Sequence, residues 1–175
     1  MAYESVLGPP KIVYRGGMQI VDNKYKANEN GVAWKAGDFL RITSDSGEVE
    51  HVVSDMTTSA GTGGIQCMAV ADYALADGNI YVPVIELTDE TVMLQQTTGT
   101  APTVADVGSL STLDLTSGAH APTLTTTAGV VLITDVYLNK KWFHAADDVC
   151  GVYGLVYFKL TPATLAIARS AAATN

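Results

Sequence analysis

The sequence predicts a mainly β protein, a small antiparallel β-sandwich or barrel with an extended N-terminal arm and at most short helices. Two observations support this fold class. Short runs rich in Val, Ile, Thr and Tyr recur along the chain, and residue types that favour turns separate them about every 8–12 residues. No repeat of fixed period interrupts this series of strands and turns. These features are typical of sandwiches and barrels.

Residues 1–31 are predicted to form the arm. Gly8-Pro9-Pro10 disfavours a helix and favours an extended chain, and Gly16-Gly17 and the stretch 28–31 are typical of turns. The apolar runs between these turns are too short for a helix with a buried face. We therefore expect two short strands here, Lys11–Tyr14 and Met18–Val21.

Residues 32–160 are predicted to form the β-rich body. A strand with Pro83 in its middle should lie at a sheet edge or beside a bulge, because proline has no N–H for the sheet. Two nearly continuous apolar runs are expected to be covered on both faces. The expected strands are 38–43, 48–53, 64–71, 79–87, 91–96, 110–115 and the two apolar runs, 129–138 and 152–160.

Residues 161–175 form the predicted tail. Thr161 is a residue type that caps helices, and Pro162 suits the first position of a helix. The tail is expected to be either a short helix over 163–173 or an extended segment.

Charge is distributed unevenly along the chain. The interval between Arg41 and Lys140 contains twelve acidic residues and no Lys or Arg, whereas residues 1–41 contain six basic and four acidic residues. The acidic body argues against nucleic-acid binding, which needs clustered positive charge. The basic N-terminal segment either lies on an acidic partner or folds back onto its own acidic body, and the sequence favours neither alternative.

The surface is predicted to be partly covered by neighbouring proteins. Charged residues make up only 16% of the chain, against a usual share of about 25%, and the mean hydropathy is +0.19. A large hydrophobic core is the alternative explanation. No signal peptide is recognised near the N-terminus and no apolar run is long enough to cross a bilayer, so folding in a cytoplasm without membrane contact is expected.

Motifs of catalysis and metal binding are weak. His51, His120 and His144 lie in no metal-ligand spacing, and His51 is expected to face solvent from a strand. Asp135 with Asp147-Asp148 suggests either a cation site or, as we expect, a solvated turn. The pair Asp72 and Asp77 is interpreted in the same way. We predict no catalytic residue, no metal and no cofactor.

Two further residue pairs each allow two interpretations. Cys67 and Cys150 are expected to be buried thiols, with a single disulfide as the alternative. Trp142-Phe143 is either an anchor in a protein interface or a plug beneath a loop.

The order of strands and turns resembles the capsid decoration proteins of tailed bacteriophages. The stretch 32–42, with Gly37-Asp38 before an apolar strand, resembles the opening of that family. The small-residue run 64–71, Asp77-Gly78 and the strand around Val82-Pro83-Val84 resemble its next segment. The remaining similar segments are 91–95, 106–108 and 152–160. The similarity covers about residues 32–160, and the Thr- and Ala-rich segment 98–128 departs from the pattern.

The resemblance implies a β-tulip-like fold without enzymatic activity. Such a protein sits on the outer surface of the virion head, after synthesis in the bacterial cytoplasm, and ties neighbouring major capsid subunits together through its N-terminal arm. It also implies a homo-oligomer, with a trimer as first choice and a dimer as second. A carbohydrate- or receptor-binding β module of a head fibre or spike is the competing hypothesis. The arm residues expected to contact the capsid are Lys11, Ile12, Val13, Tyr14, Arg15, Ile20, Lys24 and Lys26.

Overall fold

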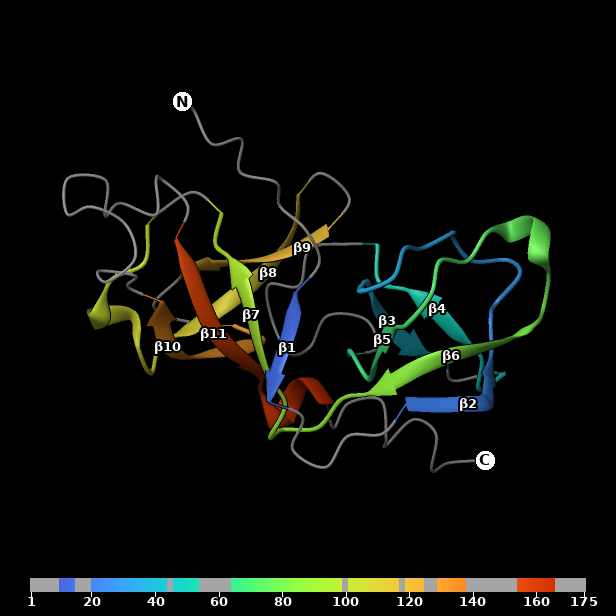
Figure 1. The fold of residues 1–175 in the computed structure, drawn as a ribbon, viewed down its shortest axis with the longest axis horizontal. Coiled ribbons are helices and arrows are strands. Elements are labelled where there is room, and N and C mark those ends of the chain that lie inside the picture. Colours follow the sequence, from blue (N-terminus) through green and yellow to red (C-terminus); the bar gives the residue numbers. More distant parts are fainter. Residues whose placement is uncertain are drawn as a thin grey trace.

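The computed structural model describes residues 10–14, 20–43, 46–53, 64–98, 101–116, 119–124, 129–137 and 154–165. In these residues the protein is mainly β, with two antiparallel sheets and only short helices, which confirms the predicted class (Figure 1). The helical elements are the 3-10 turns η1 (Leu75–Asp77) and η2 (Val104–Asp106) and a turn over 162–165.

The chain builds one sheet and then the other, with a single exception. The five-stranded sheet has the order β2 (Ile20–Lys26), β6 (Tyr81–Glu86), β5 (Cys67–Ala69), β3 (Phe39–Ile42), β4 (Val49–His51). The six-stranded sheet has the order β1 (Lys11–Tyr14), β7 (Val92–Gln96), β11 (Leu155–Leu160), β10 (Val131–Tyr137), β8 (Leu110–Thr116), β9 (Ala119–Leu124). The exception is β1, which pairs with β7 in the later sheet, with Lys11 opposite Leu94.

A bulge in β2 lies beside Pro83. The sequence predicted either an edge position or a bulge for this proline. Val21 pairs with Val84 and Tyr25 pairs with Val82, so residues 22–24 bulge out opposite Pro83 alone. Asn23, at the centre of the bulge, has a φ of 59°, which Asn tolerates better than most residues. Strand β6 has neighbours on both sides, so Pro83 is accommodated by the bulge and not by an edge position.

The five-stranded sheet is strongly curled. Its two edge strands approach each other at one bridge between Ala27 and Val49, where the Asn28 N–H donates to the Val49 carbonyl at 2.9 Å. One bridge does not close the sheet into a barrel.

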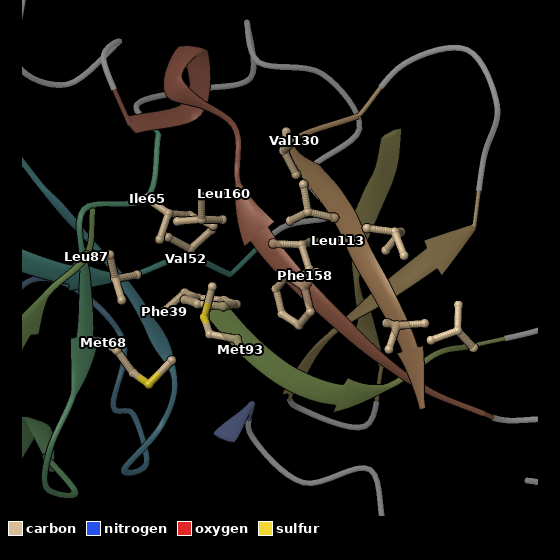
Figure 2. Packing of buried hydrophobic residues seen from close by; sticks show 14 residues of the cluster. Phe39, Val52, Ile65, Met68, Leu87, Met93, Leu113, Val130, Phe158 and Leu160 are labelled. Carbon is tan, nitrogen blue, oxygen red and sulfur yellow. The ribbon is translucent and has the colours of Figure 1, made fainter. Parts of the chain in front are cut away.

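The main hydrophobic core lies between the two sheets (Figure 2). Phe39 and Met68 reach it from the five-stranded sheet, and Met93, Ile133 and Phe158 reach it from the six-stranded sheet. All five side chains are at most 3% exposed. The two sheets therefore pack face to face in a sandwich-like arrangement.

A second cluster fills the other face of the five-stranded sheet. Leu40, Cys67 and Val84 point away from the main core because side chains alternate along a strand. Trp34 and Tyr73 cover them, with ring centroids 4.3 Å apart and two backbone hydrogen bonds between the two residues. Both faces of the central part of this sheet, around β5, are thus buried.

The two apolar runs near the C-terminus behave differently from the expectation. Along β11, Val156, Phe158 and Leu160 are buried, whereas the alternate residues are only partly buried. The prediction that both faces are covered is therefore wrong for β10, where Leu132 and Thr134 are only partly buried and Asp135 is exposed, and for β11. Its continuous apolar run arises because the outer face is half covered and still accepts apolar residues.

The described part of the predicted arm belongs to the two sheets. Strand β1 is an edge strand of the six-stranded sheet and β2 is an edge strand of the five-stranded sheet. Residues 11–14 and 20–26 therefore pair with strands of the body and do not extend away from it as a free arm. Burial of Ile12 against the main core and the long pairing of β2 with β6 explain why these strands stay with the body.

The tail begins as the sequence predicts. Thr161 caps a helical turn over 162–165: its carbonyl accepts the Thr164 N–H at 3.0 Å, and its hydroxyl lies 2.8 Å from the Thr164 hydroxyl. Thr164 is fully buried and its hydroxyl donates to the Val130 carbonyl at 3.0 Å. This hydrogen bond ties the tail to the start of β10, and residues 166–175 lie outside the described part.

Candidate functional site

The residues predicted to contact a partner lie on two edge strands. Lys11 and Val13 of β1 are exposed, and Ile12 is half buried. Ile20, at the start of β2, is 48% exposed, the same value as Val13. Arg15, Trp142, Phe143 and the side chain of Tyr14 lie outside the described residues, so their predicted roles stay predictions.

Lys24 is engaged within the protein. Its ammonium forms an ion pair with the Glu86 carboxylate on β6, and the Tyr25 hydroxyl donates to the same oxygen at 2.6 Å. The hydrogen bond to Glu86 raises the pKa of Lys24 above its usual value. Burial, and then the bond to Glu86, raises the pKa of Tyr25. This network holds the bulged strand β2 against β6.

Two further basic residues pair with the acidic body. Lys35 donates to Asp72 at 2.8 Å, and Asp72 also accepts the Ala36 N–H at 2.9 Å. The hydrogen bond from Lys35 lowers the pKa of the Asp72 carboxyl. Arg41 pairs with Glu50 across β3 and β4. Lys24, Lys35 and Arg41 therefore pair with acidic residues of the same protein. For these three residues the basic segment folds back onto its own acidic body, as the second of the two alternatives predicts.

Lys26 also has a partner of its own, since its ammonium lies 5.3 Å from the centre of the Tyr81 ring. The exposed side chains of the two edge strands therefore include Lys11, Val13 and Ile20, together with Asp22 and Asn23 in the bulge of β2. This surface is better suited to an apolar contact with few charged groups than to a contact made mainly by basic side chains.

The side chain of the histidine nearest to a carboxylate is largely shielded from solvent, contrary to the expectation that it faces solvent. His51 exposes 9% of its side chain, and its Nε2 lies 3.5 Å from Oδ2 of Asp38. The imidazole of His120, on the other sheet, is edge-on to it at 6.5 Å between ring centroids. Sequence patterns did not predict this group because Asp38, His51 and His120 come from three separate segments and match no motif of catalysis or metal binding.

The acidic turns show no cation chemistry in the described residues. Asp135 is exposed and its carboxylate accepts the Val136 N–H at 2.8 Å. Asp77 accepts the Ala74 N–H at 3.0 Å, as a turn residue does. Within the described ranges no three His, Cys, Asp or Glu side chains are placed to share a metal ion. Asp147, Asp148 and His144 lie outside those ranges.

Cys67 is a buried free thiol at the centre of the five-stranded sheet. Burial, and then the nearby Glu86 charge, raises the pKa of this thiol to about 12. The thiolate is the reactive form, so at pH 8 only about one thiol in ten thousand would be reactive. Cys150 lies outside the described residues.

We expect Cys67 to resist alkylation in the native protein. In a Cys150→Ser variant at pH 8, an aromatic disulfide reagent should release no thiolate colour within an hour, and one equivalent should appear at once in denaturant. The high pKa and full burial both predict this contrast. Rapid labelling of the native protein would contradict it.

Comparison with models of known protein families, with curated proteins and with solved structures found no match. Among the described residues no helix is long and apolar enough to cross a membrane.

Proposed function

We propose that this protein is a structural component of a virion, which binds the outer surface of a phage head and cements neighbouring major capsid subunits. On this proposal it is not an enzyme. Binding only to the assembled shell stabilises that state by mass action, and many copies add small contributions. The likeness to capsid decoration proteins over residues 32–160 first suggested this function.

One observation supports the proposal best. The first 26 residues supply an edge strand to each sheet, and each strand exposes a β-branched apolar side chain, Val13 on β1 and Ile20 on β2. Edge strands offer unpaired backbone groups to another chain. Apolar contact contributes about 25 cal/mol per Å² buried. The two strands are therefore suited to hold a neighbouring protein surface.

The net charge of −8 suits a shell-bound protein that must not bind the packaged genome. Because Lys24 is already paired with Glu86, attraction to an acidic capsid would come from few groups. Exposed charge pairs contribute about 0–1 kcal/mol each and are screened over roughly 8–10 Å. Raising the salt concentration should then slow attachment more than it hastens release.

The proposal predicts that charge on the edge strands weakens attachment. Val13→Asp and Ile20→Asp should each reduce affinity for expanded, decoration-free heads by about tenfold or more, because each buries a charge in an apolar contact. Lys24→Ala should cost less than either substitution. Co-sedimentation with the heads, followed at several salt concentrations, measures this.

Val104→Asp is the matched control, since Val104 is 67% exposed on η2, outside both edge strands. It should bind within about twofold of the wild type, and thermal melting should show all variants folded. Free capsid subunits should not bind. If Val13→Asp and Ile20→Asp attach normally, or if Lys24→Ala is the most damaging change, these strands are not the contact.

The competing function is a carbohydrate- or receptor-binding module of a head fibre or spike. One exposed aromatic favours it: Tyr81 on β6 is 52% exposed, and the Lys26 ammonium lies 5.3 Å from the centre of its ring. A saturable signal from the isolated protein on a glycan array, with no binding to heads, would support this alternative.

A further inference from the structure

A tight turn at residues 28–31 follows directly after the bridge that joins the two edge strands of the five-stranded sheet. Ala27 bridges Val49 of β4, and the Asn28 N–H donates to the Val49 carbonyl at 2.9 Å. The Asn28 side-chain amide also donates to the Glu50 carboxylate at 3.3 Å. The geometry of this turn therefore affects how the end of β2 meets β4.

Two hydrogen bonds to Asn28 hold the turn. The Asn30 N–H donates to Oδ1 of Asn28 at 2.9 Å, and the Gly31 N–H donates to the Asn28 carbonyl at 3.0 Å. Asn30 is exposed at the tip of the turn, and hydrogen bonds at such exposed tips open locally at small cost in free energy. The Gly31 nitrogen is thus held only by a bond that opens readily, next to the side-chain amide of Asn30.

An asparagine followed by a glycine is well suited to close a cyclic imide. Asparagine is a thermolabile residue, and glycine has no Cβ to obstruct the approach of its nitrogen to the preceding side chain. Asn30 is the only asparagine of the sequence that precedes a glycine. Gly31 does not have a positive φ, so the turn conformation itself does not require glycine at this position.

We propose that Asn30 is a site of spontaneous covalent modification, at which the folded protein loses ammonia and gains a carboxylate. The deprotonated Gly31 nitrogen attacks Cγ of Asn30, a bond from this nitrogen to Cγ forms, and the side-chain amide leaves as ammonia with the proton of the Gly31 N–H. Water then opens the cyclic imide. Cleavage of the new bond gives aspartate, and cleavage of the original main-chain bond gives isoaspartate. One water is consumed, one ammonia is released, and no electron is transferred.

The products differ from asparagine in charge and in backbone length. The new carboxylate adds one negative charge to the net charge of −8, beside the exposed Glu29. Isoaspartate inserts one carbon into the main chain before Gly31, so the 3.0 Å bond to the Asn28 carbonyl cannot keep its geometry. A Cβ at Gly31 would lie 3.6 Å from Cβ of Glu50, so this turn lies close to β4. We therefore expect the bridge between β2 and β4 to loosen in the isoaspartate form.

Incubation of the native protein at pH 8 and 37 °C for several weeks, followed by tryptic digestion and mass spectrometry, tests the proposal. Peptide 27–35, between Lys26 and Lys35, should gain the mass difference between O and NH, located at Asn30 by fragmentation. An isoaspartate methyltransferase should label the same peptide. The reaction should be at least about fivefold faster than at Asn23, which is exposed but precedes Lys24. The native rate should lie within about tenfold of the rate in denaturant, because the tip opens locally.

Two variants are matched controls. Gly31→Ala places a methyl group 3.1 Å from the Asn28 carbonyl oxygen without requiring a positive φ, and should slow the reaction at Asn30 at least about fivefold. Asn30→Gln should leave peptide 27–35 unmodified, since glutamine would have to close a larger and slower-forming ring. A native protein that stays unmodified while the denatured chain reacts overturns the proposal. So does a reaction that occurs chiefly at Asn23 or Asn28, or an equal rate in Gly31→Ala.

Hydrogen exchange tests the expected effect on the sheet. Anion exchange chromatography separates the aged protein, with its extra negative charge, from the fresh protein. The Asn28 N–H, which donates to Val49, should exchange at least about threefold faster in the isoaspartate form. Equal exchange in the two forms would refute the loosening of the bridge.

Discussion

Phe158→Ala should lower the free energy of unfolding by about 3–5 kcal/mol, the usual cost of removing a large side chain from a core. Phe158 is fully buried in β11, between β7 and β10, and is packed between the two sheets (Figure 2). Its strand neighbours Met93 and Ile133 are fully buried as well. Because this cavity would open in the centre of a sheet, the surroundings have little freedom to collapse into it.

Chemical denaturation measures this loss of unfolding free energy. The slope of that free energy against denaturant concentration should be the same in the variant and the wild type. Since small domains are stable by only about 5–15 kcal/mol, the variant should be close to unfolding at room temperature. Val104→Ala is the control: it also shortens an apolar side chain, but one that is 67% exposed, and should cost less than about 0.5 kcal/mol. A Phe158→Ala loss below 1 kcal/mol would mean that the sheets do not share this core.

Gly129→Ala should destabilise the protein by about 3 kcal/mol or more, the upper part of the range for overpacking. A methyl group at Gly129 would lie 2.3 Å from the Ser111 carbonyl oxygen and 2.4 Å from its nitrogen. These are backbone atoms of β8, which β9 and β10 hold on both sides. The strand cannot retreat without losing pairs such as the 3.0 Å bond from the Val130 N–H to the Ser111 carbonyl.

Gly47→Ala separates this steric effect from backbone strain. Gly47 has a φ of 69°, and a methyl group there would meet nothing within 4 Å, so only the left-handed conformation is penalised, by about 1–2 kcal/mol. Thermal or denaturant unfolding of the two variants side by side gives the comparison. Equal losses would show that the close approach of Gly129 to β8 is not a constraint.

Local patterns predicted most of the strands. The hairpin of β3 and β4 is an example: the turn residue Gly47 adopts a positive φ, and Thr43 and Glu48 are joined by a 2.7 Å backbone bond from the Thr43 N–H to the Glu48 carbonyl. Short apolar runs bounded by such turns carry enough information to place a strand. The missing N–H of Pro83 is also a local property, and it predicted either an edge position or a bulge, of which the structure shows the bulge.

One strand was missed for an equally physical reason. Strand β9 contains Pro122 and little apolar alternation, and it pairs with β8 across a hairpin. Proline is tolerated there because β9 is an edge strand of its sheet. Its residue His120 lies near Phe39 and His51 of the opposite sheet, a contact that sequence periodicity does not report.

Contacts between residues far apart in the chain were also not predicted from the sequence. The exposure of Val13 and Ile20 was consistent with the predicted site, but the pairing of Lys24 with Glu86 required knowing that β2 and β6 are neighbours. The same holds for His51, whose burial comes from Asp38 and from a histidine of the other sheet. Such contacts depend on tertiary topology, so the sequence alone left the alternatives open.

The pairing of the first strand with a strand of the later sheet has a consequence for synthesis on the ribosome. Strand β1 emerges before every other strand, yet its partner β7 lies about eighty positions later, with Lys11 opposite Leu94. At about 5–20 residues per second, the nascent β1 waits on the order of 4–16 seconds without its partner. Meanwhile all five strands of the first sheet, β2 to β6, are complete. Each newly made chain therefore passes through a stage in which one sheet is formed and its leading strand is still available to another chain.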